Sequence, residues 1–364
     1  MALVCTSGTA AANWLPAVVE AYHSRLPLLL LTADRPPESQ DCGANQTIDQ
    51  AALFGDQVRA RHAPGAPFAG FAHGWLLQLA AHAVSEACWP LPGPVHLNFA
   101  FREPLLPADP DKVKIPELPM PQAGVPLTTP DAASIAALAG HLAGRSGVIV
   151  VGGGITAPDF AEAAVALAAR LDCPILADPH SSLRFGTHDK RHLCWRHERW
   201  LRDDARREAV RPEWVLRFGE MPVTRTLQVY LADCSEHHVV EAHGRWPDPL
   251  QRTRLLVRGD AQLVARALAA AVAAPAPAAW MQYFRAAESA AADCAPPLPE
   301  GELFATLCRS LPGGSQLFCG NSLPIRDLAA WSGAGDNALR IHANRGASGI
   351  DGNIATAAGI AESV

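Results

Sequence analysis

Lysine is scarce in this chain of 364 residues, and aromatic side chains are also few, at 6%. Only three of the 30 basic residues are lysines, at positions 112, 114 and 190, and all the others are arginines. The net charge of −6 argues against a generally basic nucleic-acid-binding protein. Arginine forms forked hydrogen bonds with carboxylates, so its excess favours carboxylate recognition, although a biased genome composition produces the same excess.

Signals for export and for membrane insertion are also lacking. The nine cysteines are scattered and form no C-x-x-C pair, which argues against a disulfide scaffold or a zinc ribbon. The first residues have no basic region of the kind that begins a signal peptide. The richest aliphatic run, Leu26–Leu31, is far shorter than the roughly 20 residues that span a bilayer. We therefore expect a cytoplasmic protein with reduced thiols and no membrane insertion.

Hydrophobic residues make up 49% of the chain, enough for large cores in two or three domains. The first hundred residues alternate apolar, strand-like runs with helical patterns. Uninterrupted apolar strands separated by helices predict a parallel sheet covered on both faces. The expected strands cover 2–5, 26–33 and 94–101, and the expected helices cover about 9–23 and 67–89.

Two segments rich in proline or alanine divide the chain. We predict a first domain over 1–105, a linker over 106–128, a middle Rossmann-like domain over 129–273, a linker over 274–299, and the start of a third domain over 300–364. Each domain is expected to be a doubly wound α/β unit with a mostly parallel sheet. Both chain ends interrupt a strand–helix pattern, so we expect the first and third domains to be truncated.

Candidate binding residues follow the first two strands. The TSGTA segment after the first strand could direct backbone N–H groups at an anion, although capping by Thr or Ser is the commoner role of such a turn. The second strand leads into TADRPPESQDCGANQTID, which places Arg35, Asn45 and Gln46 where α/β sheets bind ligands. The alternative is a polar surface loop in which Arg35 pairs with Asp34.

The segment GVIVVGGGI resembles a dinucleotide-binding turn only in part. Gly152 and Gly154 match its first two glycines, Ala157 replaces the third, and Asp178 could serve as the downstream acid. A tight structural turn is the favoured interpretation.

A neighbouring stretch contains residue types that bind metals. His192, Cys194 and His197 could imitate metal ligands, but a fourth ligand is not evident, so a metal site is not favoured.

Two further motifs, GNSLPIRDL and HANRGASGIDGN, each follow a short strand. They place Ser322, Arg326 and Arg345 where these side chains could converge on an anionic, oxygen-rich substrate. The alternative assigns the glycines to tight turns and the arginines to surface ion pairs.

Together these motifs resemble a known family. TSGTAAAN, LLTADRPPE, CGANQTI, GPVHLNFAFREPL, GNSLPIRD and ANRGASGIDG are similar to the 2-succinyl-5-enolpyruvyl-6-hydroxy-3-cyclohexene-1-carboxylate synthases of menaquinone biosynthesis. We call this family the MenD synthases. The resemblance implies a thiamine-diphosphate-binding fold of three α/β domains. It also implies a transferase that decarboxylates 2-oxoglutarate and adds the product to isochorismate, in a homo-oligomer whose active site lies between subunits.

The resemblance also implies roles for single residues. Substrate contacts fall on Arg35, Asn45, Gln46, Arg225, Ser322, Arg326 and Arg345, and Gln46 could also act in catalysis. Thiamine diphosphate would be held by Ser348 and Ile350, the latter supporting its bent form. Thr224 stands where the resemblance leads us to expect a lysine, which weakens the assignment of Arg225.

Two parts of the family's machinery have no counterpart in this chain. The glutamate that faces the pyrimidine lies upstream of TSGTA, and the site for Mg²⁺ or Mn²⁺ lies beyond Val364, so no residue here is assigned as a metal ligand. We therefore predict that this chain alone is inactive. The alternatives are another thiamine-diphosphate enzyme acting on a different 2-oxo acid, and a non-catalytic nucleotide-binding module.

Overall fold

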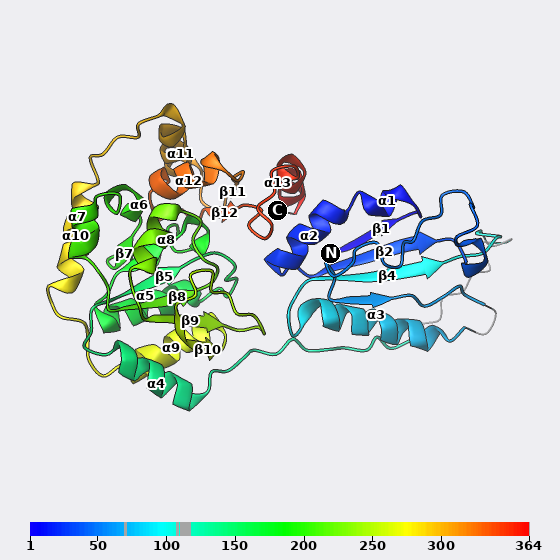
Figure 1. Cartoon of the computed structure of the whole chain (residues 1–364), viewed down its shortest axis with the longest axis horizontal. Coiled ribbons are helices and arrows are strands. Elements are labelled where there is room, and N and C mark those ends of the chain that lie inside the picture. The colour runs from blue at the N-terminus through cyan, green and yellow to red at the C-terminus, as the bar shows by residue number, and fades with distance from the viewer. Residues whose placement is uncertain (69–70, 107–108, 110–117, 364) are drawn as a thin grey trace. The chain divides into compact units, whose positions relative to one another are not determined.

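The computed structural model describes residues 1–68, 71–106, 109 and 118–363, which form two compact units (Figure 1). The first unit contains Met1–Pro126 together with the loop Asn344–Gly352. The second contains Leu127–Ala343 and Asn353–Val364. The predicted linker over 106–128 lies partly outside the described residues, and the division into three domains stays a prediction.

The first unit is built on a parallel four-stranded sheet of order β1-β2-β4-β3. Its strands are β1 (Ala2–Cys5), β2 (Leu28–Asp34), β3 (Ala60–His62) and β4 (Pro94–Ala100). The predicted parallel pairing of the three apolar strands is confirmed. No sequence pattern predicted β3, because three residues are too few to show a strand period.

Helices cover both faces of this sheet, as the apolar strands predict. On one face, Val18 of α2 (Leu15–Ser24) packs with Leu28 and Leu30. On the other face, Ala83 of α3 (His73–Cys88) packs with Val95 of β4. The expected helix over 9–23 is divided into α1 (Thr9–Ala12) and α2, because Pro16 cannot continue a preceding helix. The helix expected from residue 67 begins at His73.

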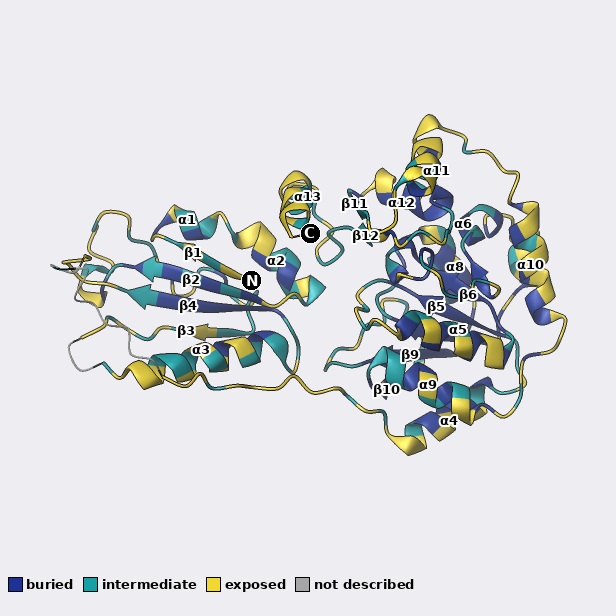
Figure 2. Ribbon diagram, turned by 180° about the vertical axis from the view of Figure 1, so that it is seen from behind, coloured by how far each residue is buried: buried dark blue, intermediate teal, exposed yellow. Residues whose placement is uncertain are grey.

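The second unit contains a parallel six-stranded sheet of order β10-β9-β8-β5-β6-β7 and a small parallel pair, β11-β12. The strands of the large sheet are β5 (Gly147–Val151), β6 (Ile175–Ala177), β7 (Leu193–Cys194), β8 (Trp214–Phe218), β9 (His237–Glu241) and β10 (Thr253–Arg258). The pair consists of β11 (Gln316–Phe318) and β12 (Arg340–His342). Figure 2 shows the central strands of the large sheet as buried.

Helices occur along the whole length of this unit, and most of them bury residues in its cores. They are α4 (Ala132–Leu142), α5 (Phe160–Leu171), α6 (His197–Trp200), α7 (Asp204–Ala209), α8 (Arg225–Ala232), α9 (Ala261–Ala271), α10 (Trp280–Ala290), α11 (Pro299–Ser310), α12 (Leu323–Trp331) and α13 (Asn353–Glu362). None of the described helices combines the length and the apolar character needed to cross a bilayer.

The predicted linker over 274–299 includes a helix that packs on the second unit. The segment 274–299 contains α10, whose Trp280 and Phe284 are buried in the core of the second unit. The indole N–H of Trp280 donates to the carbonyl of Gly147 over 2.8 Å. The alanine-rich composition suggested a linker, but burying two aromatic side chains anchors this helix on the sheet.

Candidate functional site

The loops that follow β1 and β2 meet at the carboxyl edge of the first unit's sheet. Gln46 donates from Nε2 to the Thr6 hydroxyl over 3.2 Å and to the Ser7 carbonyl over 3.0 Å. Arg35 donates from Nε to the carbonyl of Asn45 over 3.3 Å. The structure therefore brings the predicted residues Arg35, Asn45 and Gln46 together beside the TSGTA turn, at the edge where parallel α/β sheets bind ligands.

Gly8 shapes the TSGTA turn, and Gln50 holds it through a hydrogen bond. Gly8 has φ 80°, and a Cβ at this position would lie 3.0 Å from Cγ of Gln46. Its N–H donates to Oε1 of Gln50 over 2.9 Å. Gly8 is also the N-cap residue of α1, so the alternative of capping by Thr or Ser is wrong. The turn presents a close backbone approach rather than a hydroxyl cap.

A buried polar network supports these loops from below. Gln50 Nε2 donates to Oδ1 of Asn98 over 2.8 Å, and Asn98 Nδ2 donates to Oδ2 of Asp34 over 2.7 Å. The Thr32 hydroxyl is hydrogen-bonded to Asn98 and, over 2.8 Å, to Nε2 of His96. Burial lowers the pKa of His96 to about 4, so its imidazole is neutral at physiological pH.

The motifs did not predict this network, although the sequence contains a signal for it. Thr32, His96 and Asn98 interrupt otherwise apolar strands, and polar side chains in such strands need buried partners. Their bonds fix the ends of β2 and β4 relative to each other, which positions Asp34 and the neighbouring Arg35.

A forked ion pair ties two of the motifs together. Arg102, from the FREPL motif, donates from Nε and Nη2 to the two carboxylate oxygens of Glu38 over 2.5 and 2.8 Å. Glu38 belongs to the TADRPPE motif and lies in the short 3₁₀ helix Pro37–Ser39. The guanidinium of Arg102 lowers the pKa of Glu38. This pair holds the loop after β2 against the end of β4.

The loop Asn344–Gly352 is bound to α2. The carboxylate of Glu20 accepts the N–H groups of Gly346 and Ala347 over 2.7 and 2.8 Å. A Cβ at Gly346 would lie 2.5 Å from the Glu20 carbonyl oxygen, so only glycine allows this approach. Beyond this anchor, Ser348 is exposed with φ 60° and Ile350 is 68% exposed.

The remaining predicted residues lie in the second unit. Ser322 has φ 70° and is the N-cap residue of α12, and its carbonyl accepts a 3.1 Å bond from Nε of Arg326. Arg225 is exposed at the first position of α8. Ser322 and Arg326 are thus together, whereas Arg345 belongs to the first unit. The convergence of all three on one substrate stays a prediction.

Thr224 is directed into the protein. It is buried, and its hydroxyl is hydrogen-bonded to Oε1 of Glu198, which is itself only 3% exposed. Burial raises the pKa of Glu198 to about 7. Thr224, which replaces the expected lysine, is therefore part of the protein interior, while the neighbouring Arg225 is exposed.

The glycine-rich segment after β5 is a packing feature. A Cβ at Gly152 would lie 1.8 Å from the Glu220 carbonyl oxygen, so this glycine permits close contact with the chain that follows β8. Asp178 accepts bonds of 2.9 Å from the backbone N–H and from Nδ1 of His180. These contacts support the tight-turn interpretation over a nucleotide site.

The histidine–cysteine stretch is divided among separate partners. His192 is paired with Asp172 over 3.1 Å, and Nδ1 of His197 is bonded to the Cys194 carbonyl over 2.9 Å. Burial lowers the pKa of His197 to about 3 and raises that of Cys194. These contacts give the three residues structural roles and support the interpretation that does not assign them a metal.

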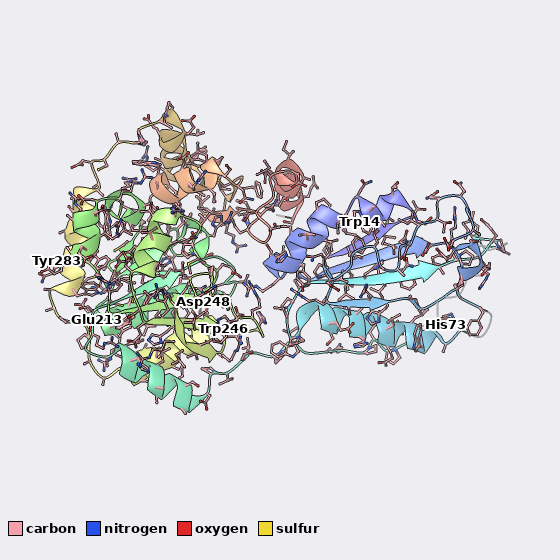
Figure 3. The ribbon with its side chains drawn as sticks, viewed as in Figure 1. Trp14, His73, Glu213, Trp246, Asp248 and Tyr283 are labelled. Atoms are coloured by element: carbon pink, nitrogen blue, oxygen red, sulfur yellow. The ribbon has the colours of Figure 1, made fainter. Side chains whose placement is uncertain are left out.

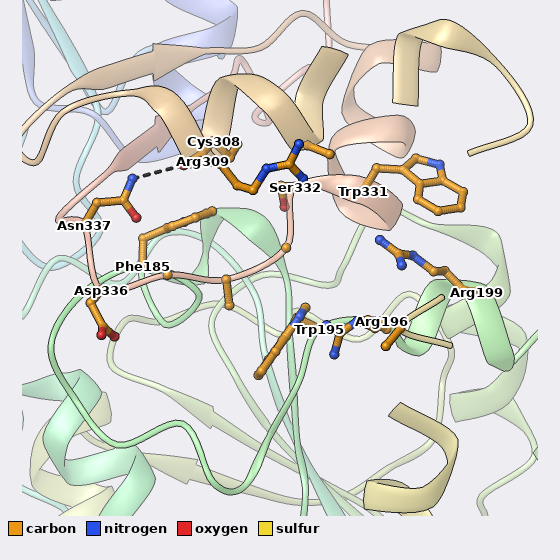
Figure 4. Close-up of a pocket in the computed structure, with 15 residues that line it drawn as sticks. Phe185, Trp195, Arg196, Arg199, Cys308, Arg309, Trp331, Ser332, Asp336 and Asn337 are labelled. Carbon is orange, nitrogen blue, oxygen red and sulfur yellow. Dashed lines mark hydrogen bonds between the residues drawn. The ribbon is translucent and has the colours of Figure 1, made fainter. Parts of the chain in front are cut away.

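A cavity of about 530 Å³ lies in the second unit, beside α6, α11 and α12 (Figure 4). Arginine side chains line the cavity, and two of them make hydrogen bonds, ring contacts or ion pairs within the protein. Arg199 donates to the carbonyl of Ala330 over 2.9 Å and lies over the Trp331 ring at 4.1 Å. Arg196 is paired with Glu288. Arg196 and Arg199 therefore connect neighbouring parts of the protein around this cavity.

Comparison with known proteins agrees with this arrangement. Residues 1–53 match the family described as "Thiamine pyrophosphate enzyme, N-terminal TPP binding domain". The chain also resembles the X-ray structure of a Mycobacterium smegmatis protein described as "a putative thiamin diphosphate-dependent enzyme". The TM-score is 0.66 and the identity 15%, over 99% of this chain and 67% of that one. The fold is therefore that of the thiamine-diphosphate-dependent enzymes.

The curated relatives give the family. The chain is 46% identical over 364 residues to the 2-succinyl-5-enolpyruvyl-6-hydroxy-3-cyclohexene-1-carboxylate synthase of Dechloromonas aromatica, and 41% identical to that of Geobacillus thermodenitrificans. Both matches cover 99% of this chain, which spans 66% and 63% of the two relatives. The chain belongs to this family, the MenD synthases.

Proposed function

We propose that this chain contributes to a transferase that decarboxylates 2-oxoglutarate and adds the product to isochorismate, as the relatives' name implies. The main support is 46% identity along 99% of the chain to one such synthase. The structure adds that the motifs TSGTA, TADRPPE, GANQT and FREPL share one sheet edge. The product would be 2-succinyl-5-enolpyruvyl-6-hydroxy-3-cyclohexene-1-carboxylate, an intermediate of menaquinone biosynthesis.

Thiamine diphosphate is the cofactor of this proposal, together with Mg²⁺ or Mn²⁺, for which no residue of this chain is assigned as a ligand. The loop Asn344–Gly352 offers the kinds of groups that would contact the cofactor, because Ile350 exposes an aliphatic side chain and Ser348 offers exposed polar groups. When bound, thiamine diphosphate supplies the carbon centre at which a 2-oxo acid loses its carboxylate. Glu20 positions this loop through the backbone at Gly346.

Substrate binding is assigned to groups that recognise carboxylates. Both proposed substrates are anions, and guanidinium forks bind carboxylates in a defined orientation. Arg35 is only half-buried at the motif edge, and Arg225 and Arg326 are exposed at the starts of α8 and α12. The proposed set is Arg35, Asn45, Gln46, Arg225, Ser322, Arg326 and Arg345, and a catalytic role is proposed for Gln46 alone.

The proposal includes the assembly and its location. We place the enzyme in the cytoplasm as a homo-oligomer whose active site lies between subunits. Light scattering of the enzyme measures the mass of the assembly directly. A mass equal to that of a single subunit would contradict the proposed homo-oligomer.

A chimera tests the activity. In the Dechloromonas aromatica synthase, this chain replaces the segment that it matches, and the chimera is assayed with 2-oxoglutarate, isochorismate, thiamine diphosphate and Mg²⁺. We expect product formation, and a large loss when Arg35 is changed to Ala. The exposed Arg309 of α11 provides the matched control, Arg309→Ala, which should retain activity. Turnover of pyruvate but not of 2-oxoglutarate would instead favour a related 2-oxo-acid enzyme.

The isolated chain is assayed in parallel. Because no residue in it is assigned as the acid facing the pyrimidine or as a metal ligand, we expect no turnover above background. Measurable product from this polypeptide alone would show that these functions are supplied by its own residues.

A further inference from the structure

Two clusters of two histidines and one glutamate occur in the part of the chain that the structure describes. One consists of His62, His82 and Glu86 in the first unit. The other consists of His141, Glu236 and His238 in the second. In each cluster the possible ligand atoms lie within 4.8 Å of one another. The two clusters differ in the charges that surround them.

The second cluster is already neutralised by arginines. Glu236 is paired with Arg145 over 3.0 Å and with Arg254 over 3.6 Å. These cations occupy the carboxylate and would repel a metal ion at the same place. The cluster is therefore a structural ion-pair network, and it serves as an internal comparison for the first.

The first cluster connects β3 to α3. Nε2 of His62 lies 2.6 Å from Oε2 of Glu86, and Nε2 of His82 lies 3.5 Å from Oε1. In the described part of the chain, the ion pairs of Glu86 are those with these two histidines. The carboxylate thus receives one imidazole on each oxygen, and no guanidinium competes for it among these pairs.

The fold explains why the three side chains meet. His82 and Glu86 are four residues apart on α3, so they lie on one face of the helix. His62 alternates with Arg61 along β3 and lies on the same side as Ala60, which packs against the cluster containing Ala83 and Leu79. Small residues let α3 approach the edge strand closely.

The neighbouring cation points to the opposite face of the sheet. Arg61 is in register with His96, whose ring contacts Phe54 in the cluster beneath α2. Side chains of paired residues share a face, so Arg61 lies on the α2 side and not beside Glu86. The α3 side retains two imidazoles and one carboxylate.

We propose that His62, His82 and Glu86 bind one divalent transition-metal ion, with Zn²⁺ as the best match. Two imidazole nitrogens and one carboxylate oxygen form a donor set that zinc accepts, with a fourth position for water. Imidazole favours zinc, copper and nickel over Mg²⁺ and Ca²⁺, which prefer oxygen ligands. The ion would join the edge strand to the helix across the 63–72 connection, apart from the motif edge of the sheet.

Titration of the metal-free full chain with Zn²⁺ tests the proposal. Calorimetry should detect one equivalent whose affinity falls at least about tenfold in His82→Gln. His82 is 64% exposed, so this change should leave the fold intact, which circular dichroism checks. Glu86→Gln should weaken the same equivalent.

Matched controls separate this site from other histidines. His73 is exposed at the start of α3 (Figure 3), and His73→Gln should leave zinc affinity unchanged. His141→Gln, in the second cluster, should also have no effect. Equal affinity of the wild-type chain and of His82→Gln and Glu86→Gln would overturn the proposal.

Thiols are the main competing ligands, because Cys42 and Cys294 are exposed. Co²⁺ distinguishes them, since cobalt bound to thiolate shows an intense near-ultraviolet charge-transfer band and cobalt bound to imidazole and carboxylate does not. We expect visible d–d bands without the thiolate band, lost in His82→Gln. A thiolate band that survives in His82→Gln together with unchanged d–d bands would assign the metal to cysteine and overturn the proposal.

Discussion

At the scale of single residues, the Glu20 carboxylate holds the loop Asn344–Gly352, for which a cofactor-binding role is proposed. Glu20 accepts two backbone N–H groups from Gly346 and Ala347, and its Oε1 also accepts from the Ser24 hydroxyl over 2.7 Å. Hydrogen bonds to a charged group contribute about 1.5–3 kcal/mol each, less where solvent screens them. Glu20 was absent from the residues picked out by motif, because it lies in the middle of a helix with an unremarkable sequence.

We predict that Glu20→Ala releases the loop Asn344–Gly352 without unfolding the first unit. The amides of Gly346 and Ala347 would then exchange hydrogen at least about tenfold faster, equivalent to about 1.4 kcal/mol of lost protection. Hydrogen exchange measured by mass spectrometry checks this.

Glu20→Gln is the graded control, because its amide oxygen can still accept one of the two bonds. Its exchange rate should fall between those of wild type and Glu20→Ala. Unchanged exchange in both variants would mean that the loop is held by other contacts.

A second residue makes stability depend on pH. Glu198 is buried, and its pKa rises from the ordinary value of 4.5 to about 7. Between these two values the folded state keeps a proton that the unfolded state has released. The free energy of unfolding therefore falls as the pH rises from 4.5 to 7, and the loss is complete above 7.

We predict that Glu198→Gln removes this loss. Glutamine resembles the protonated acid and can keep the bond to Thr224, so the stability of the variant relative to wild type should rise by about 2.5 kcal/mol from pH 5 to pH 8. Urea unfolding of the second unit at both pH values measures it.

The difference between the two proteins isolates Glu198. Buried His197, with its pKa lowered to about 3, makes both proteins more stable as the pH rises from 3 to 6.5, and this contribution is present in both. A constant difference between variant and wild type at all pH values would show that Glu198 titrates normally.

At the scale of elements, the glycines after β5 decide how two strands end. A Cβ at Gly152 would collide with the carbonyl of Glu220, just past β8. The segments that follow β5 and β8 lie side by side there, and the Gly152 N–H donates to the Phe218 carbonyl over 3.0 Å. The glycine pattern therefore reflects adjacent strands, which explains its incomplete match to a nucleotide-binding turn.

We predict that Gly152→Ala destabilises the second unit by about 1–3 kcal/mol, because the clash involves backbone that cannot move freely. Gly140→Ala is the matched control. Gly140 lies within α4 with open space around its Cβ position, so alanine there should stabilise by about 0.5–1 kcal/mol. Urea unfolding compares them, and equal effects of both changes would contradict the packing role of Gly152.

At the scale of the whole molecule, the two units have unequal cores. One continuous cluster of buried side chains surrounds the six-stranded sheet of the second unit. The four-stranded sheet of the first unit is covered by two much smaller clusters, one on each face. Buried apolar area is the main source of stability, so the first unit should be the weaker one.

We predict two thermal transitions, the first from the smaller unit. Calorimetry should resolve them, and amides of β2 and β4 should lose protection at a lower temperature than those of β5 and β8. A single transition in which all four strands lose protection together would show that the units unfold as one body.

Much of the fold follows from local pattern. Long apolar strands such as Leu28–Asp34 and Trp214–Phe218 are visible in the sequence because helices cover both faces of their sheets, and their parallel pairing follows from the helices between them. Short elements such as β3 and β7 are not visible, since two or three residues carry no period. The alanine-rich composition around α10 suggested a linker, and only the burial of its aromatic side chains in the structure shows that it packs as a helix.

The sequence by itself determined the family, the two-sided parallel sheets and the loops that contain Arg35, Asn45 and Gln46, because motifs and hydrophobic periods are local properties of a chain. Only the tertiary structure decided that Gln50 holds the TSGTA turn, that Glu20 anchors Gly346, and that His62 meets Glu86. These contacts join residues between 24 and 326 positions apart. Such pairings depend on which faces of strands and helices pack together, and no local pattern records that choice.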